Sequence, residues 1–130
     1  MDPIQKILDE SKTIAVVGLS SNPIRPSYAV AEYLQKHGYR IIPVNPNESQ
    51  VLGERAYPDL LSVPEPIDVV DVFRNPDAVP EIVRQAIQKR AKVVWMQPGA
   101  ENYDAAEVAE SSGLRTVVGM CMRAQHKDRQ

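Results

Sequence analysis

Short apolar runs alternate with amphipathic helical segments along almost the whole of this 130-residue chain. The runs are continuous in apolar residues, as at 13–18 and 91–96, which is typical of strands buried on both faces. Predicted strands lie at 13–18, 40–44, 54–57, 67–73, 91–96 and 116–120. Predicted helices lie at 2–11, 27–37, 76–90 and 102–112, with a helical turn at 58–62. Such alternation predicts βαβ crossovers and a parallel sheet.

We therefore expect one α/β domain over residues 1–130. Its core would be a Rossmann-like, doubly wound, mainly parallel sheet of five to six strands with helices on both faces. The expected order places strand 54–57 at one edge, then 40–44, 13–18, 67–73 and 91–96, with 116–120 at the other edge. Pro43 would deprive a central strand of a backbone donor, so we expect strand 54–57 to be very short. From about residue 123 we expect a polar, frayed tail.

Charge and composition exclude several functional classes. Fifteen basic and seventeen acidic residues give a net charge of −2, which argues against a nucleic-acid partner held by bulk charge. No apolar run approaches the roughly 20 residues of a membrane span, and the N-terminus lacks the pattern of a secretory signal. A single cysteine, Cys121, allows neither an internal disulfide nor a zinc site, so we expect a cytoplasmic protein without a metal.

Ligands of such sheets bind at the carboxyl ends of the strands, near the point where strand order reverses. Four loops should converge there: 18–27, 44–47, 73–77 and 97–100. In the first loop, Gly18 allows close backbone approach, Arg25 can contact a phosphate, and Ser27 is the expected N-cap of the next helix. These residues predict a phosphate or pyrophosphate site, although an ordinary βα loop explains them equally well.

Motifs of the common nucleotide-binding enzymes are incomplete. The first loop has one of the three glycines of G-x-G-x-x-G, and residues 44–46 stand where a ribose-binding carboxylate belongs. Walker A and G-x-S-x-G motifs are absent. Asp68 and Asp71 lie too early in their strand for a phospho-receiver, and hydrogen-bonded structural carboxylates are the open alternative. We predict no catalytic residues, which leaves enzymatic activity undecided but unsupported.

Three further residues are interpreted structurally. His37 lies at a helix end, where a cation is favourable. His126 is expected as an exposed histidine of the tail, with a functional role as the alternative. Cys121 is expected as a buried structural cysteine, although a thiol near a thiol cofactor could form a mixed disulfide.

Five stretches together resemble a known family. They are 14–18, 22–28, 38–46, 68–74 and 93–99, within a resemblance that covers about 12–126. The chain resembles the small stand-alone coenzyme A-binding proteins, which are similar to the N-terminal domain of the succinyl-CoA synthetase α subunit. This resemblance implies a Rossmann-like fold that binds coenzyme A at the carboxyl edge of the sheet.

The resemblance also implies the ligand-binding positions, which follow four strands. They are Gly18, Ser20, Ser21, Asn22, Arg25, Pro26, Ser27, Tyr28, Val44, Asn45, Pro46, Asn47, Phe73, Arg74, Gln97, Pro98 and Gly99. The synthetase has a lysine after its second strand, whereas residues 47–50 contain none. Arg25, Arg40 or Arg74 would then neutralise the 3′-phosphate of the ligand.

We thus expect a non-catalytic module that binds coenzyme A or an acyl-CoA. The phosphorylated histidine of the synthetase lies in a second domain, for which this chain has no counterpart, so ligase chemistry by this chain alone is unsupported. Two alternatives stay open: an NAD(P)-binding enzyme or redox-sensing domain, and an interaction subunit of a split acyl-CoA ligase. A protein partner or a homo-oligomer is also left open.

Overall fold

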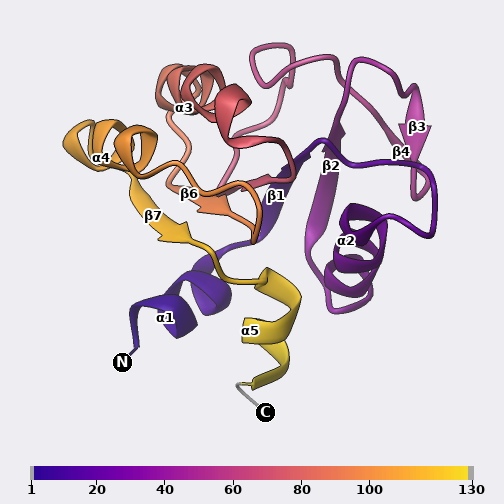
Figure 1. Ribbon diagram of the computed structural model, residues 1–130. Coiled ribbons are helices and arrows are strands. Elements are labelled where there is room, and N and C mark those ends of the chain that lie inside the picture. The colour runs from indigo at the N-terminus through magenta and orange to yellow at the C-terminus, as the bar shows by residue number, and fades with distance from the viewer. Residues whose placement is uncertain (1, 129–130) are drawn as a thin grey trace.

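The computed structural model describes residues 2–128, and its centre is a five-stranded parallel sheet in the order β2-β1-β5-β6-β7 (Figure 1). The strands are β1 (Thr13–Val17), β2 (Arg40–Val44), β5 (Val69–Val72), β6 (Val93–Met96) and β7 (Arg115–Val118). Strands β5 and β6 are buried along their whole length, as the continuous apolar sequence of β6 predicts; in β5 the burial includes the carboxyl group of Asp71. The sheet confirms the expected α/β, doubly wound class.

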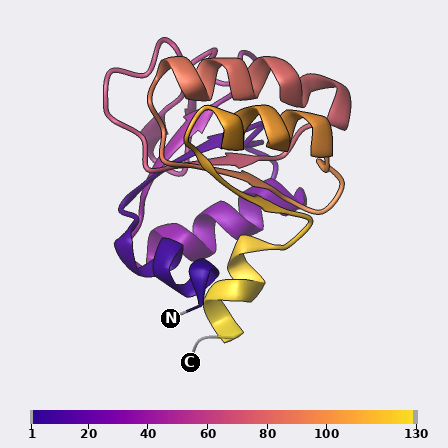
Figure 2. The ribbon, with the colours of Figure 1, turned by 90° about the vertical axis from the view of Figure 1, so that its left-hand side faces the viewer.

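Helices cover both faces of this sheet (Figure 2). They are α1 (Pro3–Glu10), α2 (Pro26–Lys36), α3 (Val79–Gln88), α4 (Tyr103–Ser111) and α5 (Met122–Asp128). Helices α3 and α4 bury their apolar side chains against one face, together with Val70 and Val72. Helices α1, α2 and α5 cover the other face, together with Val69 and Trp95. None of the helices in residues 2–128 combines the length and apolarity needed to span a membrane.

The third predicted strand does not join the main sheet, which corrects the expected strand order. Two short strands, β3 (Gln50–Val51) and β4 (Glu54–Arg55), form an antiparallel pair of their own. Within residues 2–128, a single parallel bridge, Val44 to Tyr57, extends the sheet beyond β2. The carbonyl of Pro43 accepts a hydrogen bond from Tyr57 N on this outer side, at 3.0 Å. The missing amide of Pro43 therefore faces the edge rather than β1 and removes no bond from the central ladder.

Four local expectations are also corrected. Arg25, not Ser27, occupies the N-cap position of α2. Residues 58–62 form bends and turns instead of a helical turn, and the helix predicted over 76–90 begins as a short 3-10 helix, Pro76–Ala78. The expected frayed tail is helix α5, because Met122 is fully buried against α1 and α2; residues 129–130 lie outside the described part of the chain.

His126 lies inside this packing rather than in an exposed tail. Only 8% of its surface is exposed, and its Nδ1 lies 2.7 Å from the hydroxyl of Tyr33. The His37 ring stacks on Tyr33 and contacts His126 edge-on. This aromatic cluster joins α5 to the end of α2, so His126 contributes to the packing of the C-terminal helix.

Asp68 is a hydrogen-bonded structural carboxylate, which is one of the alternatives that the sequence analysis left open. Its Oδ2 accepts hydrogen bonds from the amides of Lys12 and Thr13, and Lys92 forms an ion pair with it at 3.4 Å. Burial by itself would raise the pKa of Asp68, but these donors outweigh it and lower the pKa. Asp68 therefore joins the chain before β1 to the start of β5.

Candidate ligand-binding cleft

A cleft of about 710 Å³ opens where β1, β5 and β6 end, beside the start of α2. This is the carboxyl edge of the sheet, at the reversal of strand order between β1 and β5. Its lining comes from the loops after these strands, from α2, and from the segment before α5. The lining residues are Gly18, Ser20, Arg25, Pro26, Ser27, Val30, Phe73, Arg74, Asn75, Gln97, Pro98, Gly99, Ala100 and Cys121.

Gly18 lines the cleft where the loop after β1 closely approaches the loop after β5. Its φ is +89°, and a Cβ at this position would overlap the backbone carbonyl oxygen of Phe73. The same Cβ would lie 3.0 Å from Cδ of Arg74. Glycine is therefore required here both by its backbone conformation and by the close approach of the loop after β5.

Arg25 and Arg74 give the cleft its positive charge. Neither guanidinium forms an ion pair or a side-chain hydrogen bond with another residue in the described range 2–128, and none of the lining residues is acidic. At the start of α2, the amides of Tyr28 and Ala29 both bond to Arg25 O, while Ser27 N has no such partner among the described residues. Two unpaired guanidinium groups beside a helix N-terminus are suited to a phosphorylated ligand.

The loop before α2 is held by its own polar side chains. Ser27 Oγ accepts a hydrogen bond from Ser20 N at 3.1 Å, and Ser20 Oγ accepts one from Asn22 N at 3.0 Å. Asn22 Oδ1 in turn accepts from Ile24 N. Ser27 thus stabilises the loop from inside the first turn of α2 instead of capping the helix, and it keeps Arg25 next to the cleft.

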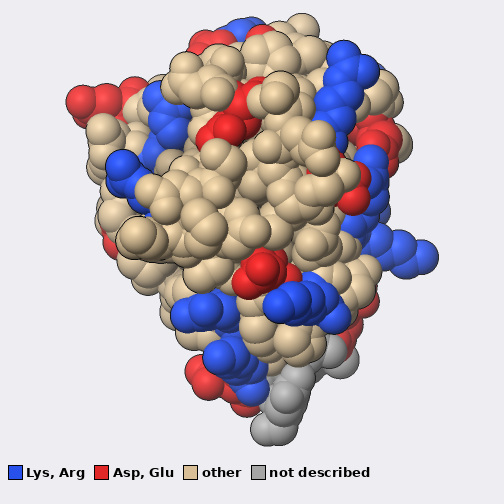
Figure 3. Space-filling view, turned by 90° about the vertical axis from the view of Figure 1, so that its right-hand side faces the viewer, with Lys and Arg blue, Asp and Glu red and all other residues tan. Residues whose placement is uncertain are grey.

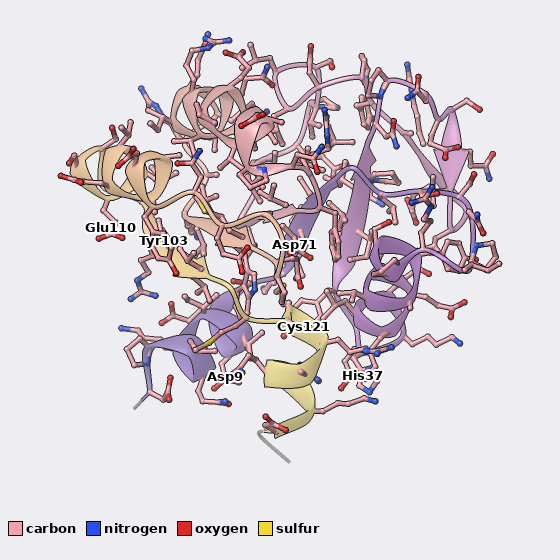
Figure 4. All side chains as sticks on the ribbon, in the orientation of Figure 1. Asp9, His37, Asp71, Tyr103, Glu110 and Cys121 are labelled. Carbon is pink, nitrogen blue, oxygen red and sulfur yellow. The ribbon has the colours of Figure 1, made fainter. Side chains whose placement is uncertain are left out.

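The wall formed after β6 rests on a buried polar pair. Gln97 is only 2% exposed, and its Nε2 donates a hydrogen bond of 2.7 Å to Oδ1 of Asp71. Asp71 is fully buried in the interior of the molecule (Figure 4), between Val16 and Trp95 of the neighbouring strands. Burial raises the pKa of Asp71 to about 7, although the bond from Gln97 acts in the opposite direction.

Ten of the seventeen predicted ligand-binding residues line the cleft. The seven that do not are Ser21, Asn22, Tyr28, Val44, Asn45, Pro46 and Asn47. The loop after β2 instead supports the loop after β1. Asn45 Nδ2 donates to Leu19 O at 3.1 Å, and Glu48 accepts from Ser21 N at 2.9 Å.

Four lining residues were not among the predicted binding positions: Val30, Asn75, Ala100 and Cys121. Asn75 and Ala100 lie in two of the four loops expected to converge, and Val30 lies one helical turn after Pro26. Cys121 is partly exposed and lines the cleft, which corrects its interpretation as a buried structural residue. Cys121 reaches the cleft because the chain turns from β7 toward α5, and no local sequence pattern predicts this turn.

Arg40 is removed from the candidates for phosphate binding. It lies at the start of β2, at the opposite end of the sheet from the cleft, and bonds to Glu65 and Glu54. The hydrogen bonds that Arg40 donates to the carboxylates of Glu65 and Glu54 raise its pKa, so its charge is paired at that end of the sheet. This leaves Arg25 and Arg74 as the cations of the cleft.

Comparison with known proteins assigns this chain to a family. A family model described as a CoA binding domain matches residues 12–127. The chain belongs to this family. The CoA-binding domain is 38% identical over 123 residues to the uncharacterized protein YneT of Bacillus subtilis, and the match covers 95% of this chain and 91% of YneT.

Solved structures of related proteins have the same fold as this chain. A hypothetical protein from Pyrococcus horikoshii OT3 superposes with a TM-score of 0.94 at 44% identity, covering 96% of this chain and 88% of that protein. The domain is also 31% identical over 117 residues to an ADP-forming acetate–CoA ligase II of Archaeoglobus fulgidus. That match covers 80% of this chain but only 17% of the ligase. The CoA-binding domain thus corresponds to a small part of the larger enzyme.

Proposed function

We propose that this protein binds coenzyme A or an acyl-CoA in the cleft at the carboxyl edge of the sheet, as a non-catalytic module. The observation that carries the proposal is the pair of unpaired arginines, Arg25 and Arg74, in a cleft without acidic lining residues. Coenzyme A presents a pyrophosphate and a 3′-phosphate, which are the groups that guanidinium binds best. A volume of about 710 Å³ is also within the usual range for a cofactor site.

Each part of the cleft suits one part of this ligand. Arg25, Arg74 and the free amide of Ser27 would hold phosphate groups. Apolar contacts from Val30 and Phe73 would accompany the pantetheine arm. The seventeen predicted binding positions remain part of the proposal, with the loop 44–47 bordering the adenosine end beyond the cleft itself.

The composition of the lining supports binding without catalysis. The lining residues include no histidine and no carboxylate, so a general acid–base pair has no candidate on the cleft surface. Cys121 is the one strong nucleophile among them. A single cysteine also fits a reducing compartment, and the proposal includes a cytoplasmic location.

A second candidate function is an interaction subunit of a split acyl-CoA ligase. It is consistent with the similarity to acetate–CoA ligases, including a separate subunit, the α subunit of ligase I from Pyrococcus furiosus, which is 32% identical over 89 residues. Co-purification with a larger protein that carries a phosphorylated histidine would support this candidate. The surface seen in Figure 3 carries both signs of charge around a broad uncharged area, and it does not favour one charged class of partner.

Ligand-induced stabilisation tests the proposal directly. Coenzyme A at about 100 times its dissociation constant is expected to add about 2.7 kcal/mol to the free energy of unfolding, and to raise Tm by several degrees. The measurement is a thermal-shift series with coenzyme A, acetyl-CoA, dephospho-CoA, NAD and NADP. A rise with NAD but not with coenzyme A would contradict the proposal and favour a dinucleotide enzyme.

Replacing Arg25 by alanine tests which phosphate this residue binds. If Arg25 pairs with the 3′-phosphate, Arg25→Ala is expected to weaken coenzyme A about tenfold or more and dephospho-CoA much less, because dephospho-CoA lacks that group. Isothermal titration calorimetry measures both. Arg115→Ala is the matched control, because Arg115 begins β7 at the opposite end of the sheet. An equal loss for both ligands would assign Arg25 to the pyrophosphate instead.

A further inference from the structure

The amide of Gln97 has one satisfied end and one free end. Its Nε2 donates to Asp71 Oδ1, but no residue in the described part of the chain donates a hydrogen bond to its Oε1. A side chain that is 98% buried normally satisfies both ends of its amide. Gln97 lines the cleft, so the partner missing at Oε1 is one that the cleft can supply.

The accessibility of single atoms agrees with this placement. Among side-chain nitrogen and oxygen atoms of residues 2–128 that are fully buried, Asp71 Oδ2 is the one without a hydrogen-bond partner. Gln97 Oε1 also lacks a partner but does not belong to that set, so it keeps contact with solvent. Gln97 is otherwise enclosed and lines the cleft, so we infer that this contact with solvent lies in the cleft.

Asp71 determines which end of the amide faces the cleft. An ionised carboxylate only accepts hydrogen bonds, so it requires the Nε2 end of Gln97. The oxygen end of the planar amide is then directed away from Asp71. The register of β5 against β6 places Asp71 beside Trp95, and Gln97 follows Trp95 by two residues, just after β6 ends. In the described residues, the side chains of Asp71 and Gln97 form no hydrogen bond other than the one that joins them.

We propose that Gln97, oriented by Asp71, presents Oε1 to the cleft as the acceptor for an N–H group of the ligand. The pantetheine arm of coenzyme A contains two secondary amides and supplies such a donor, whereas the nucleotide end presents mainly acceptors. This inference rests on the proposed function and assigns Gln97 to the arm of the ligand. Asp71 acts as a positioning residue and does not touch the ligand.

Two ligands separate this role from the rest of the site. Coenzyme A has the arm, and adenosine 3′,5′-bisphosphate has the nucleotide and phosphates without it. Gln97→Met keeps the length of the side chain but removes the acceptor, so it is expected to weaken coenzyme A about tenfold and the bisphosphate less than twofold. Isothermal titration calorimetry on the whole chain measures both. An unchanged affinity for coenzyme A, or an equal loss for both ligands, would overturn the inference.

A double variant guards against misfolding of Gln97→Met, which leaves the Asp71 carboxylate buried without its partner. Asp71→Leu/Gln97→Met replaces both members of the pair by apolar groups, a change that is often close to neutral for stability. The same selective loss of coenzyme A is expected. If the wild-type protein binds coenzyme A and the double variant binds it equally well, only this inference fails. If the wild type binds neither ligand, the proposed function fails, and the inference fails with it.

The positioning role of Asp71 has its own readout. A protonated Asp71 can donate to Oε1, which allows the amide of Gln97 to turn round and withdraw its acceptor. The other charged or titratable groups lining the cleft are Arg25, Arg74 and Cys121. From pH 5.5 to 8.5, the affinity of the wild type for coenzyme A is expected to rise several-fold more than that of Asp71→Asn, which has no carboxyl to titrate. Identical pH profiles would show that Asp71 is merely structural.

Discussion

Gly18→Ala is expected to lower the free energy of unfolding by about 3 kcal/mol or more and to abolish binding in the cleft. A non-glycine residue at φ +89° costs about 1 to 2 kcal/mol. The added Cβ would also overlap the carbonyl oxygen of Phe73, which cannot move away easily. Phe73 N donates to Val17 O at 2.8 Å, so the overlap involves two chain segments that are held together by the sheet.

Gly113→Ala is the matched control for this prediction. Gly113 has a similar φ of +93°, but a Cβ there would meet no atom within 4 Å. Gly113→Ala is expected to lose about 1 to 2 kcal/mol, which is the backbone contribution alone. Urea denaturation of both variants gives the two free energies. Equal losses would contradict the steric argument, because they would show that the overlap between the added Cβ and Phe73 costs no free energy.

Among the aspartates and glutamates of residues 2–128, Asp71 is the one whose replacement by asparagine is expected to change the pH dependence of stability most. The pKa of Asp71 rises from 3.8 to about 7 on folding because the group is buried. Between these values the unfolded chain has released its proton, and the folded protein retains it. The free energy of unfolding therefore falls as the pH rises from about 4 to 7, by on the order of 4 kcal/mol in all, and is level above that range.

The comparison of wild type with Asp71→Asn isolates this contribution. Glu65 and Asp68 have lowered pKa values, so their contributions to stability are lost as the pH falls, the opposite direction. Both groups are present in both proteins and cancel in the difference. Urea denaturation at pH 4, 5.5, 7 and 8.5 is expected to show Asp71→Asn gaining stability relative to the wild type up to pH 7. A constant difference at all four values would contradict the raised pKa.

The class of fold and the edge of the sheet that forms the cleft could be predicted from local sequence. Continuous apolar runs at β1 and β6 are typical of strands covered on both faces, and the helices between the predicted strands favour parallel neighbours. In a parallel sheet all the strands end at the same edge. The loops that begin at Gly18, Phe73 and Gln97 were therefore correctly expected to meet.

Features that depend on contacts between distant segments could not be predicted in the same way. The polar sequence after Arg123 suggests a frayed end, but burial of Met122 and His126 against α1 and α2 makes it a helix. Strand β2 lacks a full outer neighbour because the chain turns back on itself as β3 and β4. In both cases the local structure is stabilised by packing against distant segments, which local sequence propensity does not reflect.

The polar pair under the cleft shows the same division. Asp71 and Gln97 are 26 residues apart, and each alone is an ordinary polar residue near a strand. Their pairing follows from the register of β5 against β6, which sets Asp71 opposite Trp95. Burial then raises the pKa of the carboxyl and fixes the amide. Periodicity along the chain specifies which segments are strands and helices, whereas hydrogen-bond partners and the electrostatics of buried groups arise only when those segments pack together.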